Sequence, residues 1–181
     1  GIERNSSSYF KDDLYFVQPD QIFMYKNNDQ WKTFGGYCFV KPVKNDNPIS
    51  NIIDYWTIQS TGNAVDFGDL TWTQRYCGNL SNSVRALAYG GDDGSGTKYN
   101  HINYVTMSST GNAADFGDLD VARSGAPGTA SATRGVIFNG GTPASAPSGT
   151  NVIQYVTIAT LGDAKDFGDS TMLNEGLAGA T

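Results

Sequence analysis

Residues 100–118 read NHINYVTMSSTGNAADFGD, and this stretch decides the fold because it occurs three times. Residues 51–69 read NIIDYWTIQSTGNAVDFGD, and residues 151–169 read NVIQYVTIATLGDAKDFGD. The copies begin 49 and 51 residues apart. A period of this length is typical of repeat proteins, in which each unit buries its apolar surface against its neighbours.

Each period predicts several strands and no helix. The first eight residues of each copy are rich in β-branched and aromatic side chains, which indicates a strand, and the pair Gly62-Asn63 indicates a turn. Ala86–Tyr89 indicates a further strand later in the period. No segment shows helical periodicity of useful length. We therefore predict an all-β protein in which each period forms a small antiparallel sheet.

Residues that recur at the same position in each period are expected to serve the repeat itself. Aromatic rings in one register should share one buried environment, and the recurring glycines should supply unusual backbone angles. These residues are Tyr55, Tyr104, Tyr155, Phe67, Phe116, Phe167, Gly68, Gly117, Gly168, Gly90, Gly91, Gly140 and Gly141.

Composition excludes several classes of function. The chain has 181 residues, 22 of them glycine, and only 17% are charged. Its net charge of −6 and isoelectric point near 4.5 provide no basic field for nucleic acid. The longest apolar runs are far shorter than the roughly 20 residues that span a bilayer, so membrane insertion is not expected.

The recurring DFGD blocks have a chemical and a structural interpretation. Clustered hard oxygens are what calcium prefers, which makes these carboxylates weak calcium candidates. In the structural interpretation, which we prefer, the block is a tight turn: its glycine supplies an unusual backbone angle, its phenylalanine docks between units and its aspartates bind backbone or pair with Arg75 or Arg123. No metal or cofactor is therefore expected. The weak calcium candidates are Asn63, Asp66, Asp69, Asp92, Asp93, Asp115, Asp118, Asp166 and Asp169.

Catalytic residues are not evident. The single histidine, His101, stands where the other copies have Ile52 and Val152, and a lone histidine makes no triad. Several tryptophans and tyrosines, Trp72 and Tyr99 among them, would stack on sugar rings if exposed, although a core position is the more common one. Cys38 and Cys77 are interpreted as small buried thiols in preference to a disulfide bridge.

The order of these motifs resembles kelch repeats. Tyr104, a DFGD block, Ala122-Arg123-Ser124-Gly125 and a strand ending in Gly140-Gly141 follow one another as in a kelch blade, with DFGD in place of the usual tryptophan. The sequence of residues 51–181 is similar to kelch-like arrays in structural and tail-fibre proteins of aquatic bacteriophages. The resemblance implies a β-propeller type of architecture.

The same resemblance shapes the expected domain organisation. Residues 51–181 form the array, with units 51–99, 100–150 and an incomplete 151–181. Residues 1–50 lack the full period and are either a distinct β segment with a linker, for attachment or assembly, or a degenerate first blade. Because two to three blades leave apolar faces open, we expect contact with other copies in a cyclic homo-oligomer such as a trimer, or a C-terminal continuation.

We therefore expect a non-enzymatic virion protein, a tail-fibre component that assembles with other virion proteins and attaches to a host surface, where a glycan is a possible ligand. One alternative is a carbohydrate-binding or hydrolytic propeller module of a bacterial surface protein. Another is a particle-decorating scaffold protein without a ligand.

Overall fold

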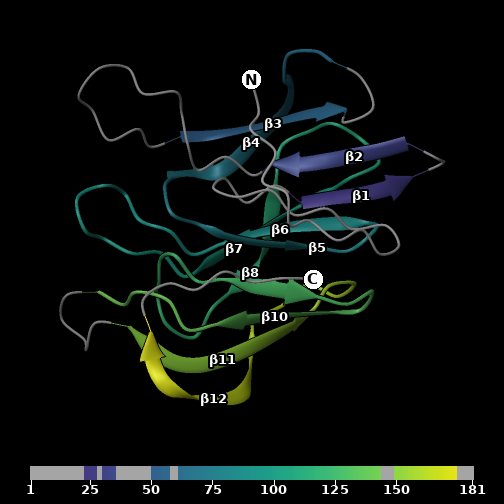
Figure 1. Ribbon diagram of the computed structural model, residues 1–181. Coiled ribbons are helices and arrows are strands. Elements are labelled where there is room, and N and C mark those ends of the chain that lie inside the picture. The colour runs from purple at the N-terminus through teal and green to yellow at the C-terminus, as the bar shows by residue number, and fades with distance from the viewer. Residues whose placement is uncertain (1–22, 28–29, 36–49, 58–60, 144–148, 175–181) are drawn as a thin grey trace, which may run out of the picture.

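The computed structural model describes residues 23–27, 30–35, 50–57, 61–143 and 149–174 (Figure 1). This part of the chain forms antiparallel β-sheets and contains no helix, as the sequence predicts. Residues 12–17, whose apolar and aromatic content predicts a strand, and the polar stretch 41–48, which is the predicted linker into the array, lie outside the described residues.

Three four-stranded sheets follow one another along the chain, and each is a simple meander. The first contains β1 (Phe23–Asn27), β2 (Gln30–Gly35), β3 (Ser50–Thr57) and β4 (Val65–Gln74). The second contains β5 (Gly78–Ser81), β6 (Arg85–Tyr89), β7 (His101–Thr106) and β8 (Ala114–Asp118). The third contains β9 (Gly128–Ala130), β10 (Arg134–Phe138), β11 (Thr150–Thr157) and β12 (Lys165–Asn174). Figure 1 shows the second sheet between the first and the third.

The sheets are offset from the sequence period by half a unit. Residues 51–99 supply β3 and β4 to one sheet and β5 and β6 to the next. The third sheet has four strands because the preceding period supplies β9 and β10, whereas the last copy of the repeat supplies only β11 and β12. The first sheet is completed by β1 and β2, since β2 pairs with β3 from Lys32 opposite Thr57 to Gly35 opposite Asp54.

The apolar core lies between neighbouring sheets. One cluster joins the first sheet to the second and includes Ile53, Phe67, Val105 and Met107. The other joins the second sheet to the third and is larger, with ten buried members that include Leu80, Tyr89, Phe116, Val156 and Ile158. The core of the described residues is therefore formed where one sheet packs against the next.

Each DFGD block forms a β-bulge within a strand, where the sequence analysis expected a turn. Ile102 lies opposite Gly117 and Asn103 lies opposite Asp115, so Phe116 is an extra residue with no partner on β7. The same shift occurs in β4 and β12. The glycine of each bulge has a φ of +147° at Gly68, +145° at Gly117 and +133° at Gly168.

The bulge is also the place where the next sheet docks. Against the first sheet, the amides of Gly111 and Ala113 donate to the carbonyls of Phe67 and Asp69 at 2.7 Å each, and the Asp69 amide donates to Asn112 Oδ1 at 3.1 Å. A Cβ on Gly68 would lie 2.4 Å from the Gly111 carbonyl oxygen, so glycine is required for this approach.

The junction between the second and third sheets repeats these contacts. The amides of Gly162 and Ala164 donate to the carbonyls of Phe116 and Asp118 at 2.7 and 2.8 Å, and the Asp118 amide donates to Asp163 Oδ1 at 3.0 Å. A Cβ on Gly117 would lie 2.5 Å from Gly162. We call this set of three hydrogen bonds the turn-on-bulge contact.

The diglycines are not in the same register, contrary to the sequence interpretation. The Gly90 amide donates to the His101 carbonyl, and the residue that makes the matching bond to Val152 is Asn139, not Gly140. Asn139 has a φ of +47°, so this asparagine takes the left-handed backbone that glycine takes at position 90.

Cys77 is disulfide-bonded, which corrects the interpretation of this residue as a free buried thiol. Cys38 is the only other cysteine of the sequence and lies outside the described residues.

Candidate functional site

The carboxylates that were considered for calcium are distributed over all three sheets. Among the described residues, no group of three or more His, Cys, Asp or Glu side chains is placed to hold a metal ion. Asp66, Asp115 and Asp166 begin the three bulges, and Asp166 Oδ1 accepts the Gly168 amide at 3.0 Å. The Oδ1 atom of Asp118 lies 3.4 Å from the Nδ1 atom of His101.

Asp92 and Asp93 are used by the loop that joins β6 to β7. Asp92 is buried, and its Oδ1 accepts from Arg75 Nε at 2.6 Å and from the Gly94 amide at 2.8 Å. Asp93 accepts from the amide and hydroxyl of Ser95 and from the Thr97 amide, and these bonds lower its pKa to about 2. The two carboxylates therefore organise this loop through protein donors.

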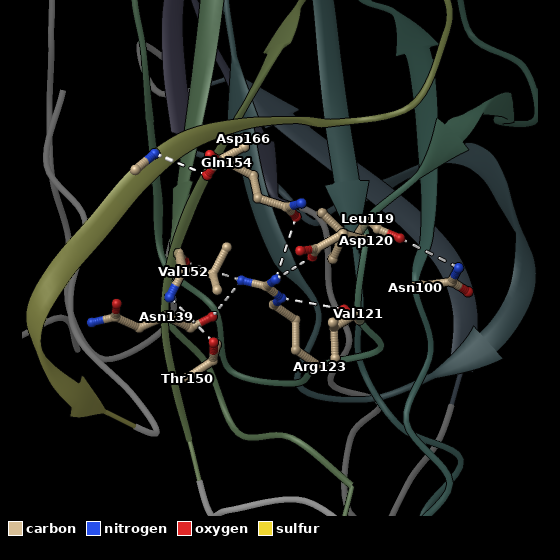
Figure 2. Close-up of polar contacts among 11 residues, drawn as sticks. Asn100, Leu119, Asp120, Val121, Arg123, Asn139, Thr150, Val152, Gln154 and Asp166 are labelled. Carbon is tan, nitrogen blue, oxygen red and sulfur yellow. Dashed lines mark hydrogen bonds and ion pairs between the residues drawn. The ribbon is translucent and has the colours of Figure 1, made fainter.

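Arg123 is fully buried and ties the second sheet to the third (Figure 2). Its guanidinium donates to the carbonyls of Asn139 at 3.0 Å and Val152 at 3.3 Å, and to Asp120 Oδ1 at 2.6 Å. Burial lowers its pKa, while Asp120 acts in the opposite direction. Arg123 therefore pairs with Asp120 and Arg75 with Asp92, and neither arginine pairs with an aspartate of a DFGD block.

An exposed aromatic cluster is the strongest candidate for a binding site. The rings of Trp72 on β4 and His101 on β7 are stacked, with centroids 5.0 Å apart and planes 8° apart. Tyr99 lies 6.3 Å from Trp72 and 5.6 Å from His101. Trp72 is 50% exposed, and Asp118 lies beside His101 with its side chain half exposed. We call Trp72, Tyr99 and His101 the aromatic platform.

The repeat itself does not need these rings. At the junction between the second and third sheets, the residue equivalent to Trp72 is Val121. The residues equivalent to Tyr99 and His101 are Thr150 and Val152. The junction between the second and third sheets therefore forms without aromatic residues at these positions. The stacked, half-exposed tryptophan therefore belongs to one of the two described junctions and is not a feature of the repeat.

From the sequence, Trp72 and Tyr99 are stacking candidates only if they are exposed, and a core position is the more common one. The structure exposes Trp72 and buries Tyr89, whose hydroxyl has no hydrogen-bond partner among the described residues. His101 was interpreted as an isolated surface or edge residue. Its stacking on Trp72 was missed because the partner lies on a different sheet, 29 positions earlier in the chain.

The comparisons identify no family: no protein-family model matches the chain, and no curated protein matches it. In the part of the chain that the structure describes, no helix is long and apolar enough to span a membrane.

Chemically, the platform offers flat apolar rings next to hydrogen-bonding groups. Such a surface suits a ligand that is apolar on one face and rich in hydroxyls at its edge, which is the character of a sugar ring. Asp118 and His101 supply an acceptor and a ring nitrogen at the rim. The carboxylate and the net charge of −6 disfavour an anionic ligand.

Proposed function

We propose that the chain is a non-enzymatic adhesive protein of the virion, of the tail-fibre type, and that its aromatic platform binds a neutral saccharide on the host surface. The observation that carries the proposal is the parallel stacking of the half-exposed Trp72 on His101, at a place where the other junction has aliphatic residues. The kelch-like order of the motifs supports the virion assignment by resemblance.

The disulfide at Cys77 supports an exported or particle-bound location. Disulfides persist in oxidising surroundings, which include virion and cell surfaces, and are rare in reducing cytosol. The net charge of −6 fits a protein that does not bind nucleic acid.

Saccharide binding is tested by titrating the purified chain with neutral oligosaccharides, such as maltohexaose, cellohexaose and mannan fragments, with calorimetry and tryptophan fluorescence as readouts. We expect saturable binding that weakens roughly tenfold in Trp72→Ala, because stacking on the ring is lost. Trp72→Tyr should retain most of the affinity. Val84→Ala is the matched control, since Val84 is 57% exposed and lies by the opposite end of β7 from His101.

Two outcomes contradict the proposal: failure of the wild-type chain to bind any member of the panel, and undiminished binding by Trp72→Ala. Cleavage of the bound oligosaccharide, followed by chromatography of the products, would instead favour a hydrolytic propeller module. Immunogold labelling separates the remaining alternatives, because the proposal predicts label on the fibres of purified particles and a bacterial surface module predicts label on cells.

A further inference from the structure

Among the described residues the turn-on-bulge contact occurs twice, and each outer sheet presents one half of a further contact. An occupied junction needs a bulge on one sheet and a Gly-Asn-Ala or Gly-Asp-Ala turn on the following sheet. The first sheet has such a turn, and no bulge in the described part of the chain docks on it. The third sheet has such a bulge, and no turn among the described residues docks on it.

The bulge of the third sheet is bare where the other two are covered. Phe167 is 53% exposed, whereas Phe67 and Phe116 are 8% and 2% exposed. A Cβ on Gly168 would meet nothing within 4 Å, although Gly68 and Gly117 are in close contact with the next turn. No described residue donates to the outward carbonyls of Phe167 and Asp169, and Asp169 is exposed.

The turn of the first sheet is bare in the same way. Gly62, Asn63 and Ala64 are exposed, and a Cβ on Gly62 would meet nothing within 4 Å. In the occupied junctions the equivalent alanines, Ala113 and Ala164, are half-buried against the preceding sheet. Asn63 carries the same side chain as Asn112, whose Oδ1 accepts the Asp69 amide.

These two bare surfaces do not meet within one chain, because the first and third sheets lie on opposite sides of the second (Figure 1). We infer that they meet between copies: the Gly62–Ala64 turn of one copy docks on the Phe167–Asp169 bulge of a second copy. The occupant of each end is thus a second copy of this chain, and the internal junctions are the template for the contact.

Such a contact is head-to-tail, so it forms a closed ring or an open polymer according to the rotation between copies. Two copies bring six sheets together, which lies within the four to eight blades of closed propellers, whereas three copies bring nine. The inferred assembly is therefore a ring of two copies with two identical intermolecular junctions, which is a cyclic homo-oligomer but smaller than a trimer. It does not depend on saccharide binding.

The test is sedimentation velocity of the 181-residue chain from nanomolar to high micromolar concentration. We expect a species of twice the 19.4 kDa chain mass that dissociates on dilution. Phe167→Glu should leave only monomer, because it places a charge in the buried junction. Asn63→Ala should raise the dissociation constant on the order of tenfold, because each of the two junctions loses a hydrogen bond.

Two control variants keep this result specific. Val84→Glu adds the same charge at an exposed site of the second sheet, which already has both neighbours, and should leave the dimer intact. Asn112→Ala removes the equivalent hydrogen bond inside the chain and should lower the melting temperature without weakening association. A monomer at all concentrations, or a dimer that both Phe167→Glu and Asn63→Ala leave unchanged, would overturn the inference. A polymer that lengthens with concentration would overturn the closed pair.

Discussion

At the scale of single residues, the same side chain has different environments in different units of the repeat. Tyrosine and phenylalanine form an edge-to-face pair in all three sheets, with centroids 6.0, 6.0 and 6.2 Å apart. Only the pairs of the first two sheets are covered by a following sheet. Position within the period therefore fixes the local geometry of a ring, and position within the array fixes its burial.

This difference predicts unequal costs for one substitution at two equivalent positions. Phe116→Ala should lower the free energy of unfolding by about 3–5 kcal/mol, because it leaves a cavity between two sheets. Phe167→Ala should cost about 1 kcal/mol or less in dilute, monomeric protein, since the ring is half exposed. Urea unfolding of both variants measures the two costs. Equal losses would show that the third bulge is covered within the chain.

At the scale of elements, the loop between β6 and β7 is held by carboxylates that the sequence offered as metal ligands. Asp93 is half-buried, and donors from Ser95 and Thr97 lower its pKa to about 2. Because the folded-state pKa lies below the ordinary value near 4, the carboxylate adds stability above pH 4, and this contribution is lost as the pH falls through 2.

Asp93→Asn is therefore expected to lower the melting temperature at pH 7 and to have progressively less effect between about pH 4 and pH 2. Thermal melts of the wild type and the variant at matched pH values give this difference directly, and other carboxylates cancel in the comparison. A difference in melting temperature that stays constant down to pH 2 would show that the Asp93 bonds do not form in solution.

The sequence predicts these elements well where the signal is local. The strand that begins each copy and the later strand at Ala86–Tyr89 both follow from β-branched and aromatic content. The bulge was mistaken for a turn, because a glycine with positive φ serves both structures and only pairing to the neighbouring strand distinguishes them.

At the scale of the molecule, the period of the sequence and the unit of the fold differ by half a repeat. A periodic sequence has no marked beginning, so the choice of unit depends on which strands pair, and the pairing of β2 with β3 places the boundary before β1. The aromatic platform was hidden for a related reason. Its rings come from β4 and the start of β7, which belong to adjacent sheets.

The turn-on-bulge contact is the feature on which the fold and the inferred assembly both depend, and amide hydrogen exchange tests it most directly. In dilute protein, the amides of the two internal junctions should exchange slowly because each is hydrogen-bonded across a sheet boundary. These amides belong to Asp69, Gly111, Ala113, Asp118, Gly162 and Ala164.

The equivalent amides at the two ends, those of Gly62, Ala64 and Asp169, should exchange rapidly in the monomer and become protected as the concentration rises and copies associate. Slow exchange at the first six positions, with concentration-dependent protection at the last three, is the result that this account predicts. Exchange at Gly111 and Gly162 as rapid as at Gly62 in the same dilute sample would contradict it.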